Sequence, residues 1–167
     1  MEMKIRTYGD PVLRKKSEKI DDINEELLEL IEYMKKTMYS ASGIGLAAPQ
    51  VGINKRLFII DIGEGIKTII NPEFIESNSS IIEMEEGCLS IPGTYKKVKR
   101  PEKVTVKYLN EKGEEIIEEA DGIYARALQH ENDHLDGIMF VDRLSTVGKK
   151  LVSKKLDAIK KETLKNL

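Results

Sequence analysis

Hydrophobic positions near the start of the chain recur with helical spacing. Asp22 and Glu25 resemble a capping pair that opens a helix. The apolar positions that follow lie three or four residues apart, which places them on one helical face. Such a stripe is far more typical of a core face than of a cofactor site. Its members are Ile23, Leu27, Leu30, Ile31, Met34 and Met38.

From Lys55 onward the spacing changes to that of strands. Val104, Val106 and Tyr108 alternate with polar residues, as in a strand with one buried face. The Asn-Glu-Lys-Gly run at 110–113 predicts a hairpin turn. Six strands are predicted in this part of the chain, at 57–61, 68–76, 81–85, 95–100, 104–109 and 115–119.

A second helix is predicted between Asp121, a suitable N-cap, and Gly137, a suitable glycine beyond the last turn. Its apolar stripe begins with Ile123 and Ala127. A final helix begins at about Ser145. Strands between helices, joined mostly by short turns, predict an α+β fold with antiparallel sheets.

The length of the chain predicts a single domain over residues 1–167. A chain of this size buries roughly 70% of its unfolded surface. Charged residues make up 34% of the sequence, but the net charge is only −2, which disfavours DNA as a specific partner. We expect no signal peptide and no membrane partner, because no apolar stretch has the necessary length. A single cysteine cannot form an internal disulfide, so we expect a cytoplasmic protein.

Both histidines of the chain fall in one H-E-x-x-H run, formed by His130, Glu131 and His134. On a helix, positions i and i+4 share a face, so both imidazoles can bind one metal ion. The histidines continue the apolar stripe of the predicted helix, and a buried metal is a suitable partner for them. Glu131 would then lie beside the metal, placed to move protons for a water.

A catalytic metal site of this kind uses three protein ligands and leaves one position for water. No third histidine exists, so the candidates are Cys88 and a glutamate after the helix. A lone cysteine is most often a small buried hydrophobe. The neighbours of Cys88 favour a ligand, because Gly87 permits a tight backbone turn and Leu89 offers a main-chain N–H near the sulfur.

Two other classes of protein fit parts of this pattern. A zinc peptidase that shares only H-E-x-x-H would take its third ligand from a glutamate after the helix. A metal-stabilised binding module would fill the fourth position with protein, for example with the carboxylate of Asp133 or Glu86.

A third run, Gly-Ile-Gly-Leu-Ala-Ala-Pro-Gln at 43–50, is typical of a glycine-rich turn after a helix. It lacks the lysine of a phosphate-binding loop and the spacing of a dinucleotide fingerprint. Gln50 ends the run with an uncharged amide donor, which is suited to stabilising a developing oxyanion.

In this order and spacing, the runs GIGLAAPQ, EGCLS and QHENDH resemble the three motifs of the peptide deformylases. All three match without a substitution at the positions that the family uses for chemistry, and Gln129 and Asp133 also fit. The resemblance extends from the Tyr-Gly-Asp-Pro-Val-Leu-Arg run at 8–14 to the Phe-Val-Asp-Arg-Leu run at 140–144.

The resemblance implies sheets wrapped around a central helix that bears the histidines. It implies hydrolysis of the formyl amide on the N-terminal methionine of new polypeptides, with release of formate. Cys88, His130 and His134 would hold the metal, and a water activated there would attack the formyl carbon. Glu131 would act as general base and then as general acid, while Gln50 and the Leu89 N–H would bind the oxyanion.

By the same resemblance, Ile44, Ile123 and Ala127 contribute to an apolar slot for the methionine side chain. The alternative interpretation is that all three are ordinary core residues. The peptide backbone would pair in an extended form with Gly45 and Gly87. In one departure from the family, Tyr95 stands where some relatives carry arginine near the entrance.

Imidazole and thiolate ligands suit zinc and several other first-row metals. The resemblance implies ferrous iron, with zinc, nickel or cobalt as replacements.

The last part of the chain, 145–167, predicts a basic amphipathic helix. Leu151, Leu156, Ile159 and Leu164 supply its apolar side, and its seven lysines face only Asp157 and Glu162. A solvated helix packed on the body is the simpler interpretation. In related bacterial deformylases such a helix is associated with docking on the ribosome, which makes the ribosome a possible partner.

Overall fold

The computed structural model describes residues 3–167 and has an α+β fold in which a central helix lies between two antiparallel sheets. In chain order its elements are the 3-10 helix η1 (Pro11–Arg14), α1 (Glu25–Ser40), β1 (Gly45–Ala47), η2 (Ala48–Val51), β2 (Leu57–Ile60), β3 (Lys67–Ser77), β4 (Ile81–Cys88), β5 (Ile91–Pro101), β6 (Lys103–Leu109), β7 (Glu115–Asp121), α2 (Gly122–Leu135), η3 (Phe140–Arg143) and α3 (Thr146–Lys165).

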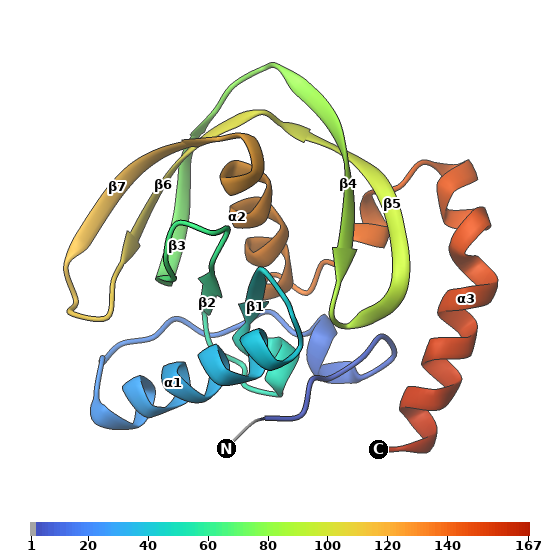
Figure 1. Cartoon of the computed structure of the whole chain (residues 1–167), viewed down its shortest axis with the longest axis horizontal. Coiled ribbons are helices and arrows are strands. Elements are labelled where there is room, and N and C mark those ends of the chain that lie inside the picture. Colours follow the sequence, from blue (N-terminus) through green and yellow to red (C-terminus); the bar gives the residue numbers. More distant parts are fainter. Residues whose placement is uncertain (1–2) are drawn as a thin grey trace.

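Five strands form one antiparallel sheet in the order β1-β2-β3-β6-β7, while β4 and β5 form a separate hairpin. Figure 1 shows α2 between the larger sheet and the β4–β5 hairpin, with α1 below and α3 alongside β5. This arrangement confirms the predicted fold class. It also places the helix that carries both histidines at the centre of the molecule.

Three apolar clusters hold these layers together. The first packs the larger sheet against α2, through residues such as Phe58, Val106 and Leu128. The second packs α1 on β1 and β2, and includes four residues of the predicted stripe, Leu27, Ile31, Met34 and Met38, at 2% exposure or less. The third joins η1, β5, η3 and α3. The apolar stripe of α1 is therefore a core face, as predicted.

The predicted start of the first helix is wrong. Asn24, not Asp22, is the N-cap of α1, and its side chain accepts a hydrogen bond of 2.9 Å from the backbone N–H of Leu27. A capping oxygen must stand two or three residues before a free N–H, so the first turn selects Asn24. Ile23 lies before the helix and packs against the second cluster.

The second helix has the predicted ends. Asp121 occupies the N-cap of α2, and Gly137 adopts a φ of +74° two residues after its last turn. A Cβ at Gly137 would stand 2.6 Å from the carbonyl oxygen of Arg14. Glycine is therefore required there by both backbone conformation and space.

The run at 43–50 is more ordered than the predicted turn. Gly45–Ala47 pairs with β2 as the edge strand β1, and Ala48–Val51 forms η2. A strand this short gives no periodic signal in the sequence. The hairpin is also longer than predicted, because β4 continues to Cys88 and β5 starts at Ile91. Both extensions bring candidate site residues to strand ends.

The C-terminal helix starts as predicted, with the Ser145 side chain capping α3 at the Gly148 N–H. Its predicted apolar side is partly wrong. Leu156 and Ile159 pack against the body, but Leu151 and Leu164 are 69% and 49% exposed, and their neighbours Val152 and Thr163 are buried instead. The lysines on both flanks did not distinguish between such neighbouring positions.

Candidate active site

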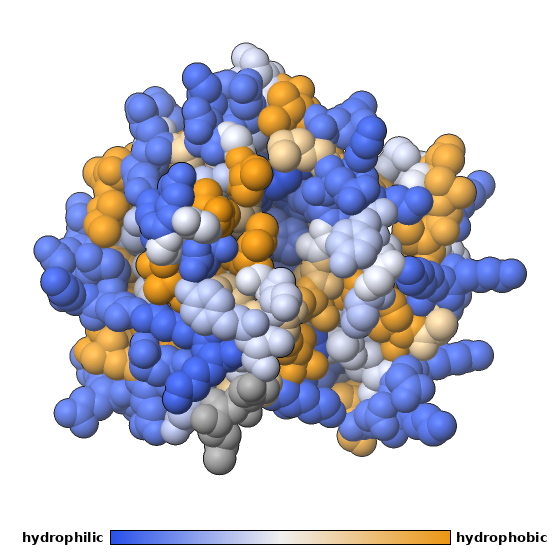
Figure 2. All heavy atoms as spheres, viewed as in Figure 1, coloured by the Kyte–Doolittle hydropathy of each residue, from blue (hydrophilic) through white to orange (hydrophobic). Residues whose placement is uncertain are grey.

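A cavity of about 600 Å³ opens between α2, β1 and the β4–β5 hairpin. Helix α2 contributes five of its lining residues at spacings of three or four positions, so one helical face forms the wall. The face seen in Figure 2 is hollowed near its centre, with hydrophobic side chains along one side of the hollow. The α2 residues in this wall are Ile123, Arg126, Ala127, His130 and Glu131.

Cys88 and His130 line this cavity, and the buried His134 lies beside Cys88. Their ligand atoms all lie within 4.8 Å of one another, and Cys88 Sγ is 3.3 Å from His134 Nε2. Sulfur and nitrogen ligands of one tetrahedral metal stand about 3.5 Å apart, given usual bond lengths of about 2.3 and 2.0 Å. In the described part of the chain, no other group of three such side chains comes this close. The donor set therefore fits one divalent metal ion.

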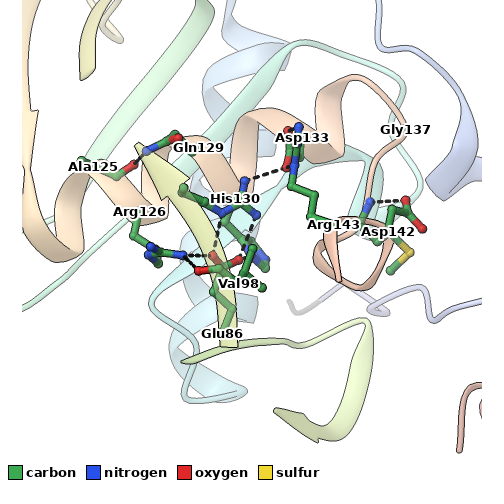
Figure 3. A network of polar contacts seen from close by, with 12 residues as sticks. Glu86, Val98, Ala125, Arg126, Gln129, His130, Asp133, Gly137, Asp142 and Arg143 are labelled. Carbon is green, nitrogen blue, oxygen red and sulfur yellow. Dashed lines mark hydrogen bonds and ion pairs between the residues drawn. The ribbon is translucent and has the colours of Figure 1, made fainter. Parts of the chain in front are cut away.

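The buried carboxylate of Glu86 orients His130 (Figure 3). Glu86 Oε1 is 2.8 Å from His130 Nδ1, which leaves Nε2 of the ring free for a metal. The same carboxylate accepts two hydrogen bonds from Arg100 and one from Arg126. Burial raises the pKa of Glu86, but the hydrogen bonds from His130 and Arg100 outweigh burial and lower it overall. Glu86 is therefore ionised, and its charge is matched by its neighbours.

Asp133 extends this network by about one turn along α2. It accepts hydrogen bonds from Arg100 and, in a two-point contact, from Arg143. The ring of Phe140 stacks on His130 with centroids 6.0 Å apart. These contacts hold α2 in place along its length, so that the two histidine rings keep their positions relative to each other.

The glutamate of the H-E-x-x-H run is buried beside the histidines. Glu131 is 5% exposed, and its Oε1 atom has no hydrogen-bond partner in the described structure. A Cβ at Gly45 would stand 2.6 Å from Glu131 Oε2, so the carboxylate lies directly against the bare Cα of β1. Burial raises the pKa of Glu131 to about 7. Such a group can exchange protons near neutral pH.

Gln50 reaches the same point from η2. Its Oε1 atom accepts a hydrogen bond from the Ala47 N–H at 2.9 Å, which fixes the amide plane. Its Nε2 atom then points at Ser90 Oγ, 3.1 Å away, and at Cys88 Sγ, 3.5 Å away. Leu89 lies between these two residues and lines the cavity. The structure thus brings Gln50 and Leu89 beside Cys88, one of the three candidate metal ligands.

The predicted substrate residues also line this cavity. Ile44 and Ile123 are both 56% exposed, whereas Ala127 is buried. Exposed isoleucines at a cavity mouth are not ordinary core residues, but Ala127 also belongs to the first apolar cluster. Gly45 and Gly87 face the opening from β1 and β4.

Tyr95 covers part of this opening from β5. A Cβ at Gly87 would collide with its ring, so the ring rests on the Gly87 backbone. The tyrosine is 62% exposed and therefore forms part of the rim.

The sequence did not reveal the charged network behind the ligands. Glu86 and Asp133 appeared there as possible fourth ligands of a binding module, and Asp133 also as a residue that fits the QHENDH motif, but the structure pairs both with arginines. Arg100 gave no signal, because it stands among lysines as a surface arginine would. Arg126 gave one weak hint, because its neighbours Ala125, Ala127 and Leu128 are apolar.

No helix in the described part of the chain is both long enough and apolar enough to cross a membrane.

Comparisons with known proteins agree with the site. The family model for polypeptide deformylase matches residues 2–150. A peptide deformylase of Fusobacterium nucleatum is 48% identical over 166 residues, which cover 98% of this chain and 95% of the relative. Peptide deformylase 1 of Clostridium acetobutylicum is 56% identical over 141 residues, covering 84% of this chain and 93% of the relative.

Solved structures give the same result. The Legionella pneumophila peptide deformylase superposes with a TM-score of 0.90 at 42% identity and covers 98% of both chains. The Synechococcus elongatus enzyme, solved in complex with actinonin, has a TM-score of 0.87 at 45% identity, with 92% of this chain and 85% of that chain covered. This chain therefore belongs to the polypeptide deformylase family, hydrolases that remove the formyl group from the N-terminal methionine of new proteins.

Proposed function

We propose that the cavity described above is the deformylase active site and that Cys88, His130 and His134 hold its metal ion. The observation that carries this proposal is the convergence of their three ligand atoms within 4.8 Å, beside a buried glutamate. Neither rival class accounts for it. A peptidase would not need the cysteine, and a binding module would not need an unpaired carboxylate oxygen beside the ligands.

A bound divalent metal would supply Lewis acidity, which lowers the pKa of water towards about 7 and polarises the formyl oxygen. Glu131 accepts the proton of the attacking water. It later delivers that proton to the nitrogen of the leaving amine as formate departs. Its Oε1 atom has no hydrogen-bond partner among the described residues and Oε2 lies against Gly45, so the carboxylate is held beside the ligands with one oxygen available for both steps.

Gln50 stabilises the negative charge that develops on the formyl oxygen. Its amide is held by the Ala47 N–H, so the Nε2 hydrogen on the side of Cys88 can donate to the oxygen without rotation of the side chain. The backbone N–H of Leu89 is the second donor. Because both donors are in place before reaction, stabilising the charge costs little rearrangement.

The substrate lies between two strand edges. β1 is the edge strand of the larger sheet, and Gly45 is its first residue; Gly87 lies across the opening in β4. An extended peptide pairs with both glycines, and its methionine side chain enters between Ile44, Ile123 and Ala127. Main-chain pairing of this kind accepts varied residues beyond the methionine.

Ferrous iron is the proposed native metal, with zinc, nickel or cobalt as replacements. The test is formate release from formyl-Met-Ala-Ser by protein purified without oxygen and loaded with either iron or zinc. Rapid release with iron and much slower release with zinc supports both the reaction and the metal. Equal rates support the reaction but make zinc the native ion, and no release from folded, metal-loaded protein contradicts the reaction.

The proposed setting is the cytoplasm, where nascent formylated chains are made, with the ribosome as a partner through α3. The seven lysines of this helix against two acidic residues favour binding to phosphate-rich RNA. Co-sedimentation with ribosomes at low salt tests this, using a chain that ends at Thr146 as comparison. Unchanged co-sedimentation of the truncated chain would contradict the docking role.

A further inference from the structure

One wall of the methionine slot carries a charge, although such a slot would be expected to be aliphatic. Arg126 lines the cavity one helical turn before His130, and its side chain is only 7% exposed. It crosses from α2 to the β4–β5 hairpin, where Met84 also lines the cavity. Residues i and i+4 share a helical face, about 6 Å apart along the axis, so Arg126 lies on the same side of α2 as His130.

The guanidinium has more donors than protein acceptors. It carries five N–H groups. Nη1 donates to Glu86 Oε2 and to the Val98 carbonyl, both at 2.7 Å, and Nη2 donates to the Ile82 carbonyl at 2.9 Å. The Nε hydrogen and one Nη2 hydrogen have no acceptor among the described residues. Figure 3 shows Arg126 held by Glu86 beside His130, which fixes its orientation.

Unused donors on a cavity wall favour a ligand that brings an acceptor. A methionine thioether is a weak acceptor and gains little from a guanidinium. Oxidation to methionine sulfoxide adds a polar oxygen at the sulfur. In an aliphatic slot that oxygen would lose its water without compensation. Against Arg126 it would receive a charge-assisted hydrogen bond instead.

We propose that this enzyme also deformylates peptides that begin with formyl-methionine sulfoxide, and that Arg126 determines this specificity. The inference rests on the proposed function, because it uses the same slot and the same reacting centre. The formyl C–N bond breaks, water supplies the oxygen of formate and the proton of the amine, and the sulfoxide leaves unchanged. The product is then available to enzymes that reduce or remove oxidised methionine.

The experiment compares kcat/KM for formyl-Met-Ala-Ser and for its two sulfoxide epimers, assayed separately because the slot is chiral. The measured quantity is the sulfoxide-to-thioether ratio for the better epimer. In Arg126→Met this ratio should fall by about 10-fold or more relative to the unaltered enzyme, as expected for loss of a hydrogen bond to a charged group. A general loss of activity in the variant lowers kcat/KM for both substrates alike, because both react at the same centre, so it leaves the ratio unchanged.

Arg143→Gln is the matched control. Arg143 belongs to the same ionic network through Asp133 but does not line the cavity, so its loss should leave the ratio unchanged. Should Arg126→Met fail to fold, Arg126→Lys is judged on the same ratio, because it keeps the charge but loses the planar set of donors.

Equal ratios in the Arg126 variant and the unaltered enzyme would overturn the proposal, as would complete inertness of both epimers. If the unaltered enzyme also fails to act on the thioether peptide, the proposed function itself is wrong. The two failures are therefore distinguishable in one set of assays.

Discussion

At the scale of single residues, the site depends on side chains held by contacts away from the chemistry. Gln50 is fixed by the Ala47 N–H, and Glu131 is confined by the bare backbone of Gly45. Each residue thus acts from a position that its neighbours determine. Substituting either the acting residue or the one that confines it should affect turnover more than metal binding.

Gln50→Ala removes the proposed oxyanion donor without touching a metal ligand. Loss of one such donor commonly lowers kcat by about 10²–10³-fold. We expect that loss in formate release from formyl-Met-Ala-Ser, with metal content unchanged by elemental analysis. For comparison, Glu131→Ala should lose more activity, and Cys88→Ala should lose the metal. A near-normal kcat in metal-loaded Gln50→Ala would remove this residue from the mechanism.

Gly45→Ala tests whether the glycine positions the general base. The added Cβ would stand 2.6 Å from Glu131 Oε2, so either the carboxylate or β1 must shift. Misplacement of a reacting group by about 1 Å can cost about 10²-fold in rate. We expect kcat to fall by about 10–100-fold with metal retained. Gly148→Ala, on α3 outside the cavity, is the control and should keep full activity.

At the scale of elements, α2 is held at both ends. Its C-terminal end meets the carbonyl of Arg14 through Gly137. Near its start, Tyr124 donates to Glu118 of β7, which also accepts from Tyr108 and from Lys67 of β3. The Lys67 ammonium lies over the Tyr124 ring, 4.3 Å from its centroid. One carboxylate thus ties the first turn of α2, the helix that carries both histidines, to three strands.

Glu118→Gln should destabilise the protein at neutral pH by about 1–3 kcal/mol, the usual cost of weakening bonds to a charged group. Burial raises the pKa of Glu118, but the bonds from Tyr124 and Lys67 outweigh burial and lower it overall. A carboxyl with a lowered folded-state pKa stabilises the fold above its unfolded-state pKa of about 4.3. That stabilisation is lost as the pH falls through the folded-state value.

Urea unfolding at pH 7 and at pH 3 checks this expectation. The difference between Glu118→Gln and the unaltered protein should be clear at pH 7 and much smaller at pH 3. Glu119→Gln, at the exposed neighbouring position, should show no difference at either pH. A constant difference across the two pH values would mean that the charge of Glu118 does not stabilise the fold.

At the scale of the whole molecule, the sequence predicted the features that depend on a local pattern of residues. Three features have a regular spacing in the sequence and lie in the predicted elements. They are the apolar stripe of α1, the alternation in β6 and the pair of histidines on α2. The burial of Arg100 was not predictable, because nothing local separates it from surface arginines. It depends on Glu86 and Asp133, which lie 14 and 33 residues away. Ion pairs between residues this far apart in the sequence form because the topology of the fold brings them together.

The same topology predicts how the protein responds to metal removal. Apolar clusters join α2 and α1 to the larger sheet and α3 to the β4–β5 hairpin, and buried ion pairs join the hairpin to α2; none of these contacts includes a metal. Chelation should therefore abolish formate release but leave the protein folded. The loss of stability should be near that of a removed ligand, about 2.7 kcal/mol at a metal concentration 100 times its Kd.

Circular dichroism and melting curves, recorded before and after chelation, measure this loss. Re-addition of ferrous iron without oxygen should restore both activity and melting temperature, whereas Cys88→Ala should already melt like the chelated protein. Wholesale unfolding on chelation would instead favour a metal-stabilised module. That result would mean that the metal ion holds the β4–β5 hairpin to α2. The buried ion pairs of Glu86 with Arg100 and Arg126 would then be too weak to hold the two elements together.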